Sequence, residues 1–158
     1  MSTQRELLLL RHAQAGAGSV SGRDYDRVLT DFGRTQPGPV GEALLEAGFK
    51  PQLVLCSASA RTRETLGLLD DSGLCSGAEL RFSEGLYECT TRQILMELAA
   101  VESAVERVLL LGHNPGLSDL ATALSRRAVG LQPGDCAWLE FEHDWQSLGS
   151  GPVKLKTL

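Results

Sequence analysis

The stretch Glu6-Leu7-Leu8-Leu9-Leu10-Arg11-His12 (ELLLLRH, residues 6–12) decides the fold class that we expect. Its apolar run stops at Arg11, far short of a membrane span, and is typical of a strand buried on both faces of a sheet. Similar apolar runs follow at 53–56 and 107–111, with helical patterns between them. This alternation predicts an α/β fold, a three-layer sandwich whose mainly parallel sheet is covered by helices on both faces.

Local signals place the other elements along the chain. Leu80 and Phe82 suggest a short strand, and residues 136–141 and 153–155 suggest two strands at an antiparallel C-terminal end of the sheet. We expect a short helical turn after Thr30, then a break and a second helix with Pro39 at its first position.

Further helix signals lie in the second half of the chain. Thr90 and Gln93 form a capping box for a helix that we expect to reach Val105, and Pro115 suits the first position of a later helix. Neither a repeat nor a long linker is visible, so residues 1–158 are expected to form one domain.

Composition narrows the classes of protein. The 158 residues are 42% apolar and 22% charged, which is ordinary for a globular chain. The formal charge of -5 argues against a nucleic-acid partner, and no segment suggests a membrane partner. The four cysteines are not arranged as C-x-x-C and no signal peptide is visible, so we expect buried free thiols and a cytoplasmic location.

Polar side chains follow three of the predicted strands. Arg11 and His12 end the first, residues 57–61 follow the second, and His113 and Asn114 follow a later one. Because ligands of open α/β sheets bind at the carboxyl ends of the strands, these groups are expected to converge on one crevice. A single histidine at a strand end is commonly a surface or capping residue, whereas two of the three histidines in such positions favour a functional site.

Four segments resemble the histidine phosphatase superfamily, which contains the phosphoglycerate mutases. Residues 10–13 (LRHA) resemble its R-H-G opening, and residues 57–65 (SASARTRET) resemble its S-x-x-x-R-[AT]-x-x-T element. Residues 111–114 (LGHN) resemble its second histidine motif. Residues 24–33 (DYDRVLTDFG) are similar to a stretch of the short, SixA-like branch of phosphohistidine phosphatases.

The resemblance implies a metal-independent phosphatase without a cofactor. His12 would be the nucleophile and would carry the phosphoryl group as phosphohistidine. Arg11 and Arg61 would each offer a planar fork of donors to the phosphoryl oxygens, and His113 would add a hydrogen bond from a ring nitrogen. No cysteine or histidine pair has the spacing of zinc ligands.

The remaining site residues follow from the same motifs. The family's proton donor often lies in an L-x-E element, so Glu88 in Leu86-Tyr87-Glu88 is the candidate, with Glu84 as its rival and a solvated surface charge as the alternative. Gln14, Ser57 and Asn114 are expected to help bind substrate.

Three readings of function stay open. The first is a phosphatase acting on phosphohistidine in a protein or on a small phosphorylated metabolite. The second is a non-catalytic phospho-ligand binding module, and the third a mutase-like transferase, for which the chain has little room. The substrate and the oligomeric state are not fixed by the sequence, and residues 15–28 are expected to form a loop over the pocket.

Overall fold

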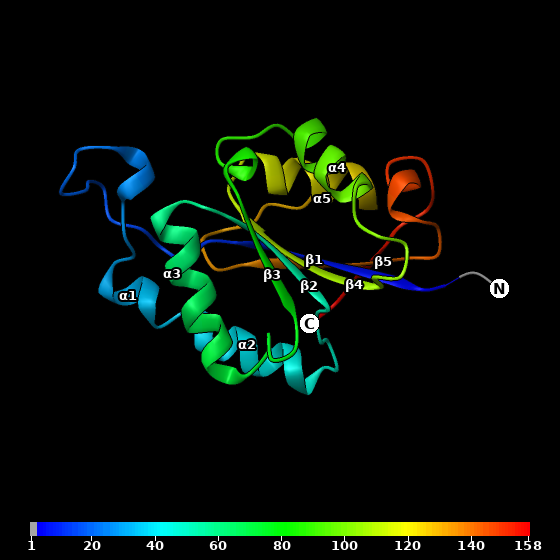
Figure 1. The fold of residues 1–158 in the computed structure, drawn as a ribbon, viewed down its shortest axis with the longest axis horizontal. Coiled ribbons are helices and arrows are strands. Elements are labelled where there is room, and N and C mark those ends of the chain that lie inside the picture. The colour runs from blue at the N-terminus through cyan, green and yellow to red at the C-terminus, as the bar shows by residue number, and fades with distance from the viewer. Residues whose placement is uncertain (1–2) are drawn as a thin grey trace.

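The computed structural model describes residues 3–158 and confirms the three-layer α/β sandwich (Figure 1). One sheet has the strand order β3-β2-β4-β1-β5-β6. The strands β3, β2, β4 and β1 are parallel to one another. The strand β5 is antiparallel to β1 and β6 is antiparallel to β5, as expected for the C-terminal end. The strands are β1 (Arg5–Arg11), β2 (Leu53–Ser57), β3 (Glu79–Ser83), β4 (Arg107–Gly112), β5 (Cys136–Phe141) and β6 (Lys154–Lys156).

Helices cover both faces of the sheet. In Figure 1, α2 and α3 lie below it and α4 and α5 above it. The helices are α1 (Asp31–Arg34), α2 (Pro37–Glu46), α3 (Ala60–Leu69), α4 (Thr91–Ala99) and α5 (Gly116–Ser125), and the short 3-10 turns include η1 (Asp24–Asp26) and η3 (Glu84–Leu86). Within residues 3–158, no helix is long and apolar enough to cross a bilayer.

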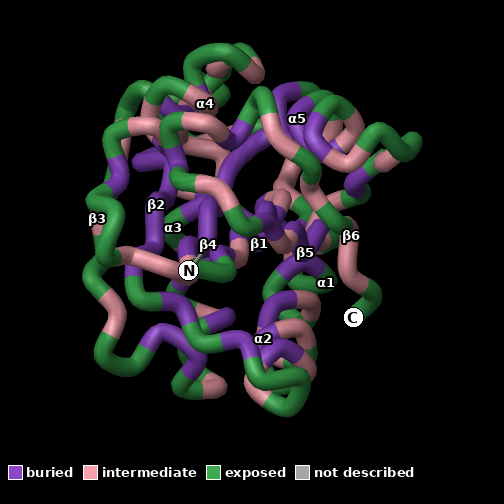
Figure 2. Tube along the Cα trace, turned by 90° about the vertical axis from the view of Figure 1, so that its right-hand side faces the viewer, coloured by how far each residue is buried: buried purple, intermediate pink, exposed green. Residues whose placement is uncertain are grey.

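Alternation along the central strands builds a separate core under each helical layer. Leu7 and Leu9 of β1 face α4 and α5, whereas Leu8 and Leu10 face α2 and α3. All four side chains are at most 1% exposed, and Figure 2 shows burial concentrated along the strands. The run Leu7 to Leu10 contains no alternating polar residues because neither face of β1 is exposed to solvent.

Helix ends agree with the predicted caps but differ at the prolines. Thr30 and Thr90 cap α1 and α4, and the capping box with Gln93 is complete. The helix start expected at Pro39 is wrong, because α2 begins at Pro37; both prolines fit in the first turn, whose N–H groups have no partner within the helix. Pro115 is likewise wrong as a first helical residue, since it caps α5 from one position earlier.

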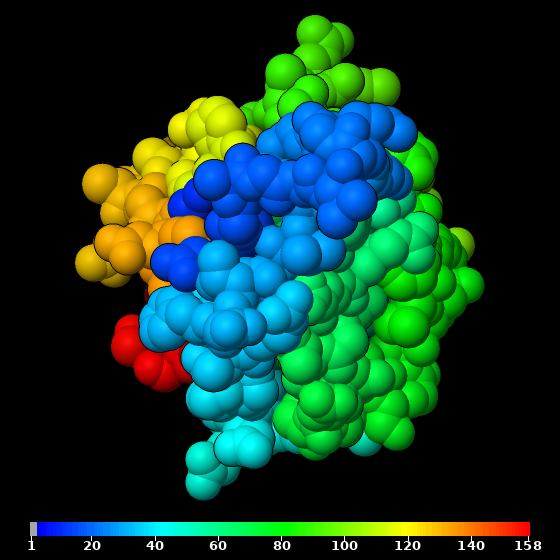
Figure 3. All heavy atoms as spheres, turned by 90° about the vertical axis from the view of Figure 1, so that its left-hand side faces the viewer, coloured from blue at the N-terminus to red at the C-terminus, as the bar shows by residue number. Residues whose placement is uncertain are grey.

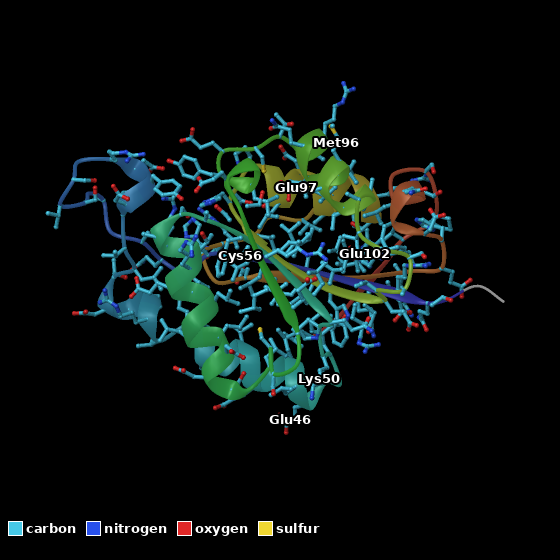
Figure 4. The ribbon with its side chains drawn as sticks, in the orientation of Figure 1. Glu46, Lys50, Cys56, Met96, Glu97 and Glu102 are labelled. Carbon is cyan, nitrogen blue, oxygen red and sulfur yellow. The ribbon has the colours of Figure 1, made fainter. Side chains whose placement is uncertain are left out.

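The extent of one helix and the burial of the thiols also differ from expectation. The helix α4 ends at Ala99, so Val105 lies outside it, although Val105 still packs against the core. All four cysteines are free, but only Cys56 and Cys75 are fully buried, the other two being partly exposed. Figure 4 labels Cys56, which lies one residue before the end of β2.

The strand register brings the three predicted polar segments to one edge of the sheet. Arg11 at the end of β1 pairs with Gly112 at the end of β4, and Cys56 of β2 pairs with Leu111 of β4. The segment that follows β1 covers this edge of the sheet, and Figure 3 shows the molecule from that side. The carboxyl ends of β2, β4 and β1 therefore form the floor on which a site is built.

Candidate active site

His12 lies at the end of β1 with its orientation fixed by the backbone. Its side chain is 7% exposed, and its backbone N–H donates to Gly112 O at 3.1 Å. The ring atom Nδ1 lies 2.7 Å from Ala13 O. A carbonyl oxygen only accepts, so Nδ1 carries the hydrogen and Nε2 of the neutral ring is left with its lone pair.

His113, which follows β4, lies beside His12. The two ring centroids are 5.3 Å apart, and His113 is 8% exposed. Burial, followed by the nearby guanidiniums, lowers the pKa of His12 to about 4 and that of His113 to about 3. Both imidazoles are therefore neutral at pH 7.

Arg61 stands in the first turn of α3 and is 5% exposed. Its Nη1 donates to Asp24 O at 2.9 Å, and its Nη2 lies 3.1 Å from Asp24 Oδ2. Asp24, in η1, is also bonded by Tyr87 Oη and by Arg27 Nε, and these contacts lower the pKa of its carboxyl to about 2. The loop of residues 15–28 thus lies against the site and supplies Arg61 with an anionic partner.

Three buried nitrogens of this cluster have no hydrogen-bond partner among residues 3–158. They are Arg11 Nε, Arg61 Nε and His113 Nδ1. Buried polar groups in proteins are nearly always paired, so unpaired ones mark places where a ligand completes the bonding. Two guanidiniums and a ring nitrogen suit an anion with several oxygens.

Three residues predicted to bind substrate have hydrogen-bond partners within the protein. The amide of Gln14 accepts from Thr30 Oγ1 at 2.7 Å, and the amide of Asn114 donates to Leu131 O at 2.7 Å while its oxygen accepts from Ser118. Ser57 is completely buried, with Oγ 2.8 Å from His113 Nε2. The structure therefore gives each of these side chains a bonding role within the protein.

The two candidate proton donors occupy different pockets. Glu88 is exposed and shares a pocket of about 550 Å³ with His113 and Asn114. Glu84 lines a neighbouring pocket of about 560 Å³ with Asp24 and accepts from Tyr25 Oη at 2.7 Å. Glu88 is the one placed beside a site histidine.

Within the described part of the chain, no three His, Cys, Asp or Glu side chains gather closely enough to hold a metal ion. Positive charge near the two imidazoles comes from Arg11, Arg27 and Arg61, which all act on His12. The residues of the site are thus suited to an anion.

The residues of this site lie within a segment that matches a known protein family. The model of the histidine phosphatase superfamily, branch 1, matches residues 7–113, which contain all the groups described above from Arg11 to His113. The chain belongs to this superfamily. An uncharacterized chloroplastic protein of Arabidopsis thaliana is similar to it, with 31% identity over 171 residues that cover 99% of this chain and 78% of that protein.

Solved structures of the superfamily share the fold. One from Nakamurella multipartita, assigned as phosphohistidine phosphatase SixA, has 30% identity and a TM-score of 0.86 over 99% of this chain and 95% of that chain. A second, with the same assignment, from Agrobacterium tumefaciens, has 26% identity and a TM-score of 0.79 over 87% and 92%. This histidine phosphatase chain is therefore SixA-like in structure.

Several site contacts of this histidine phosphatase chain were not expected from its sequence. Asp24 and Arg27 lie in the segment that resembles the SixA-like branch, and this resemblance was the one indication in the sequence that they belong to the site. Nothing in the sequence indicated that Asp24 forms an ion pair with Arg61. Tyr87 precedes Glu88, yet it is Tyr87 whose hydroxyl reaches Asp24. Thr65 Oγ1 accepts from Ala13 N at 3.1 Å and so fixes the backbone next to His12.

The lowered pKa values predict a pH dependence of stability. The unfolded chain binds a proton at each imidazole near pH 6.5, whereas folded His12 does so only near 4 and His113 near 3. The free energy of unfolding is therefore expected to fall as pH decreases from about 6.5 to about 4, because the unfolded state binds more protons there. Urea unfolding at several pH values measures this slope, which should be smaller in His12→Gln. An NMR titration of the His12 imidazole with its inflection near 6.5 would contradict the assignment.

Proposed function

We propose that this chain is a phosphatase that hydrolyses phosphohistidine in a protein through a phosphohistidine intermediate on His12. The observation that carries the proposal is the His12 ring, whose Nδ1 is bonded to Ala13 O and whose low pKa leaves Nε2 unprotonated at neutral pH. A module that only binds phosphate has no need of an oriented lone pair beside the anion site. The SixA assignment of similar structures supports the phosphohistidine substrate.

The proposed reaction has two displacements at phosphorus. In the first, the lone pair of His12 Nε2 forms a bond to phosphorus, and the bond to the leaving imidazole nitrogen breaks with its electron pair on that nitrogen, which is protonated. In the second, a water oxygen attacks phosphorus and gives up a proton to solvent, the bond to His12 breaks with its electron pair returning to Nε2, and inorganic phosphate leaves. Arg11 and Arg61 neutralise the charge that builds up on the equatorial oxygens in both steps.

The proton donor depends on the substrate. A phosphohistidine substrate releases an imidazole, which leaves readily once protonated, so it requires little help from Glu88. An alkyl phosphate releases an alkoxide and would depend on such a donor. Replacement of Glu88 by Gln is therefore informative only when both substrate types are compared.

The direct test is a panel of phosphorylated compounds assayed for phosphate release. We expect the highest kcat/KM with a protein phosphorylated on histidine, and lower values with phosphoserine peptides and small phosphate esters. Turnover confined to a small ester would replace the proposed substrate, and binding of phosphate without turnover of any compound would leave the binding-module reading. The proposed cytoplasmic location stays a prediction, supported by the four free cysteines.

Activity is expected to require no divalent metal, because Arg11 and Arg61 supply the positive charge that a metal ion supplies elsewhere. Dialysis against EDTA should leave the rate unchanged. Vanadate, which resembles the pentacoordinate phosphorus, should inhibit competitively in the same preparation. Loss of activity on dialysis that magnesium or zinc restores would contradict the mechanism.

A further inference from the structure

The hydroxyl of Ser57 lies within hydrogen-bond distance of the His113 ring. Ser57 is the last residue of β2 and is 0% exposed, and its Oγ is 2.8 Å from His113 Nε2. Within residues 3–158, the Ser57 hydroxyl makes no other hydrogen bond. A second hydroxyl, Ser59 Oγ, lies at 3.4 Å from the same nitrogen.

The neighbouring hydroxyl hydrogens can be assigned by elimination. Thr62 Oγ1 lies 2.6 Å from Ser57 O and 3.0 Å from Ser59 O, and carbonyl oxygens only accept, so the Thr62 hydrogen points to a carbonyl. Ser59 Oγ, 2.7 Å from Thr62 Oγ1, is then the donor in that pair. Ser59 has no hydrogen left for His113, and the longer 3.4 Å separation agrees with this.

Among the described residues, the hydrogen of Ser57 has one acceptor within hydrogen-bond distance, His113 Nε2. Were His113 Nε2 protonated, it would donate to Ser57 Oγ, and the Ser57 hydrogen would be buried without a partner, which is unfavourable. With Nε2 unprotonated, the Ser57 hydroxyl donates to it, and the hydroxyl hydrogens of Ser57, Ser59 and Thr62 are all paired. The remaining hydrogen, on His113 Nδ1, is the one that a bound anion can accept. We propose that Ser57 is a positioning residue that holds His113 as the tautomer protonated on Nδ1.

This tautomer determines what His113 offers to the site. Its Nδ1 is buried and has no hydrogen-bond partner in the described part of the chain, and the ring lies beside that of His12. Protonated, Nδ1 is a hydrogen-bond donor for a phosphoryl oxygen, whereas the other tautomer would present a lone pair and repel it. This step rests on the proposed function, since it takes a phosphoryl group as the ligand.

A neutral imidazole has two tautomers, so it needs a hydrogen-bond partner to select one of them. A cationic imidazole carries a hydrogen on both nitrogens and needs no such partner. Burial and the nearby Arg61 keep the pKa of His113 near 3, so the ring carries a single hydrogen at neutral pH. Which nitrogen holds that hydrogen is decided by the bond at the other nitrogen. Ser57 therefore acts on the reaction through His113 and does not touch the substrate.

The experiment compares Ser57→Ala with Ser59→Ala, which removes an equally buried hydroxyl two residues away. Nitrogen-15 NMR of the substrate-free protein should show His113 with Nδ1 protonated and Nε2 unprotonated in the wild type and in Ser59→Ala. In Ser57→Ala the tautomers should become mixed, and kcat should fall about 10- to 100-fold, the range typical of partners that orient a functional histidine. In the His113→Gln background, Ser57→Ala should cause no further loss.

Two outcomes would overturn this proposal: a wild-type His113 protonated on Nε2, or a Ser57→Ala protein with an unchanged tautomer. Ser57→Thr retains the hydroxyl and should keep the wild-type tautomer, so it tests the role again if Ser57→Ala does not fold. The NMR result does not depend on turnover. A protein with the expected tautomer that hydrolyses no phosphorylated compound would contradict the proposed function and leave the tautomer assignment intact.

Discussion

Replacement of His12 by alanine is expected to reduce phosphate release to background. The substitution removes the proposed nucleophile, while Arg11, Arg61 and His113 remain to bind the anion. Brief incubation of the wild type with labelled substrate should leave an acid-labile, base-stable phosphoryl label on His12, and the variant should carry none. Phosphate binding should persist in the variant, so the two readouts separate chemistry from binding.

His143 offers a matched control for this experiment. It follows β5, whose residue Phe141 pairs with Arg5 at the start of β1, so it lies at the opposite edge of the sheet from His12. His143→Ala should keep both turnover and label. The melting temperatures of both variants should stay close to that of the wild type, because polar residues outside the apolar core contribute little to its packing. Wild-type turnover by His12→Ala would disprove the mechanism.

Replacement of Arg61 by alanine is expected to lower kcat by on the order of 10² to 10³, by analogy with the loss of one oxyanion donor. Arg61 is 5% exposed and its charge acts on both histidines, so we expect it to act on phosphoryl oxygens with little screening by water. Arg61→Lys should recover only part of the rate, because an ammonium keeps the charge but lacks the planar fork.

The control for lost charge is Arg81→Ala. Arg81 lies in the edge strand β3 and pairs with Glu79 and Glu102, so its removal changes the net charge equally without touching the site. The kcat of Arg81→Ala should equal that of the wild type. If Arg61→Ala and Arg81→Ala reduced the rate by the same factor, the effect would be one of overall charge, and Arg61 would have no specific place in the reaction.

The layers and the floor of the site could be predicted from the sequence because their signals are local. An unbroken run such as Leu7 to Leu10 has one common solution, a strand buried on both faces, and the polar residue after each run marks the strand's carboxyl end. Helix caps such as Thr30 and Thr90 are equally local. These features determined where His12, Arg61 and His113 would lie.

Contacts between segments far apart in sequence could not be predicted in the same way. The bond between Asp24 and Arg61 joins η1 to α3, and nothing near Asp24 in sequence indicates its partner. Ser57 was correctly placed at the strand end, but its complete burial beneath His113 follows from the packing of β2 against β4. Whether a polar side chain faces a ligand or another side chain is decided by tertiary structure.

Gly33 is constrained by a contact with a distant segment that the sequence alone does not show. A β-carbon at this position would lie 2.1 Å from Gln14 O, so any side chain would push α1 away from the backbone that follows His12. Gly33 N also donates to Thr30 Oγ1 at 2.9 Å, which ties the same turn together. The glycine is therefore required by close approach of two segments.

The carboxylate of Asp24 is a counter-ion for Arg61 that the protein itself supplies. An arriving anion meets an arginine that is already neutralised, and it must share Arg61 with Asp24 or displace it. A monovalent anion would exchange one single charge for another and gain little, whereas a phosphoryl dianion brings twice the charge to the same guanidinium. We therefore expect the site to discriminate between anions by valence, with chloride a weak competitor of a phosphoryl dianion.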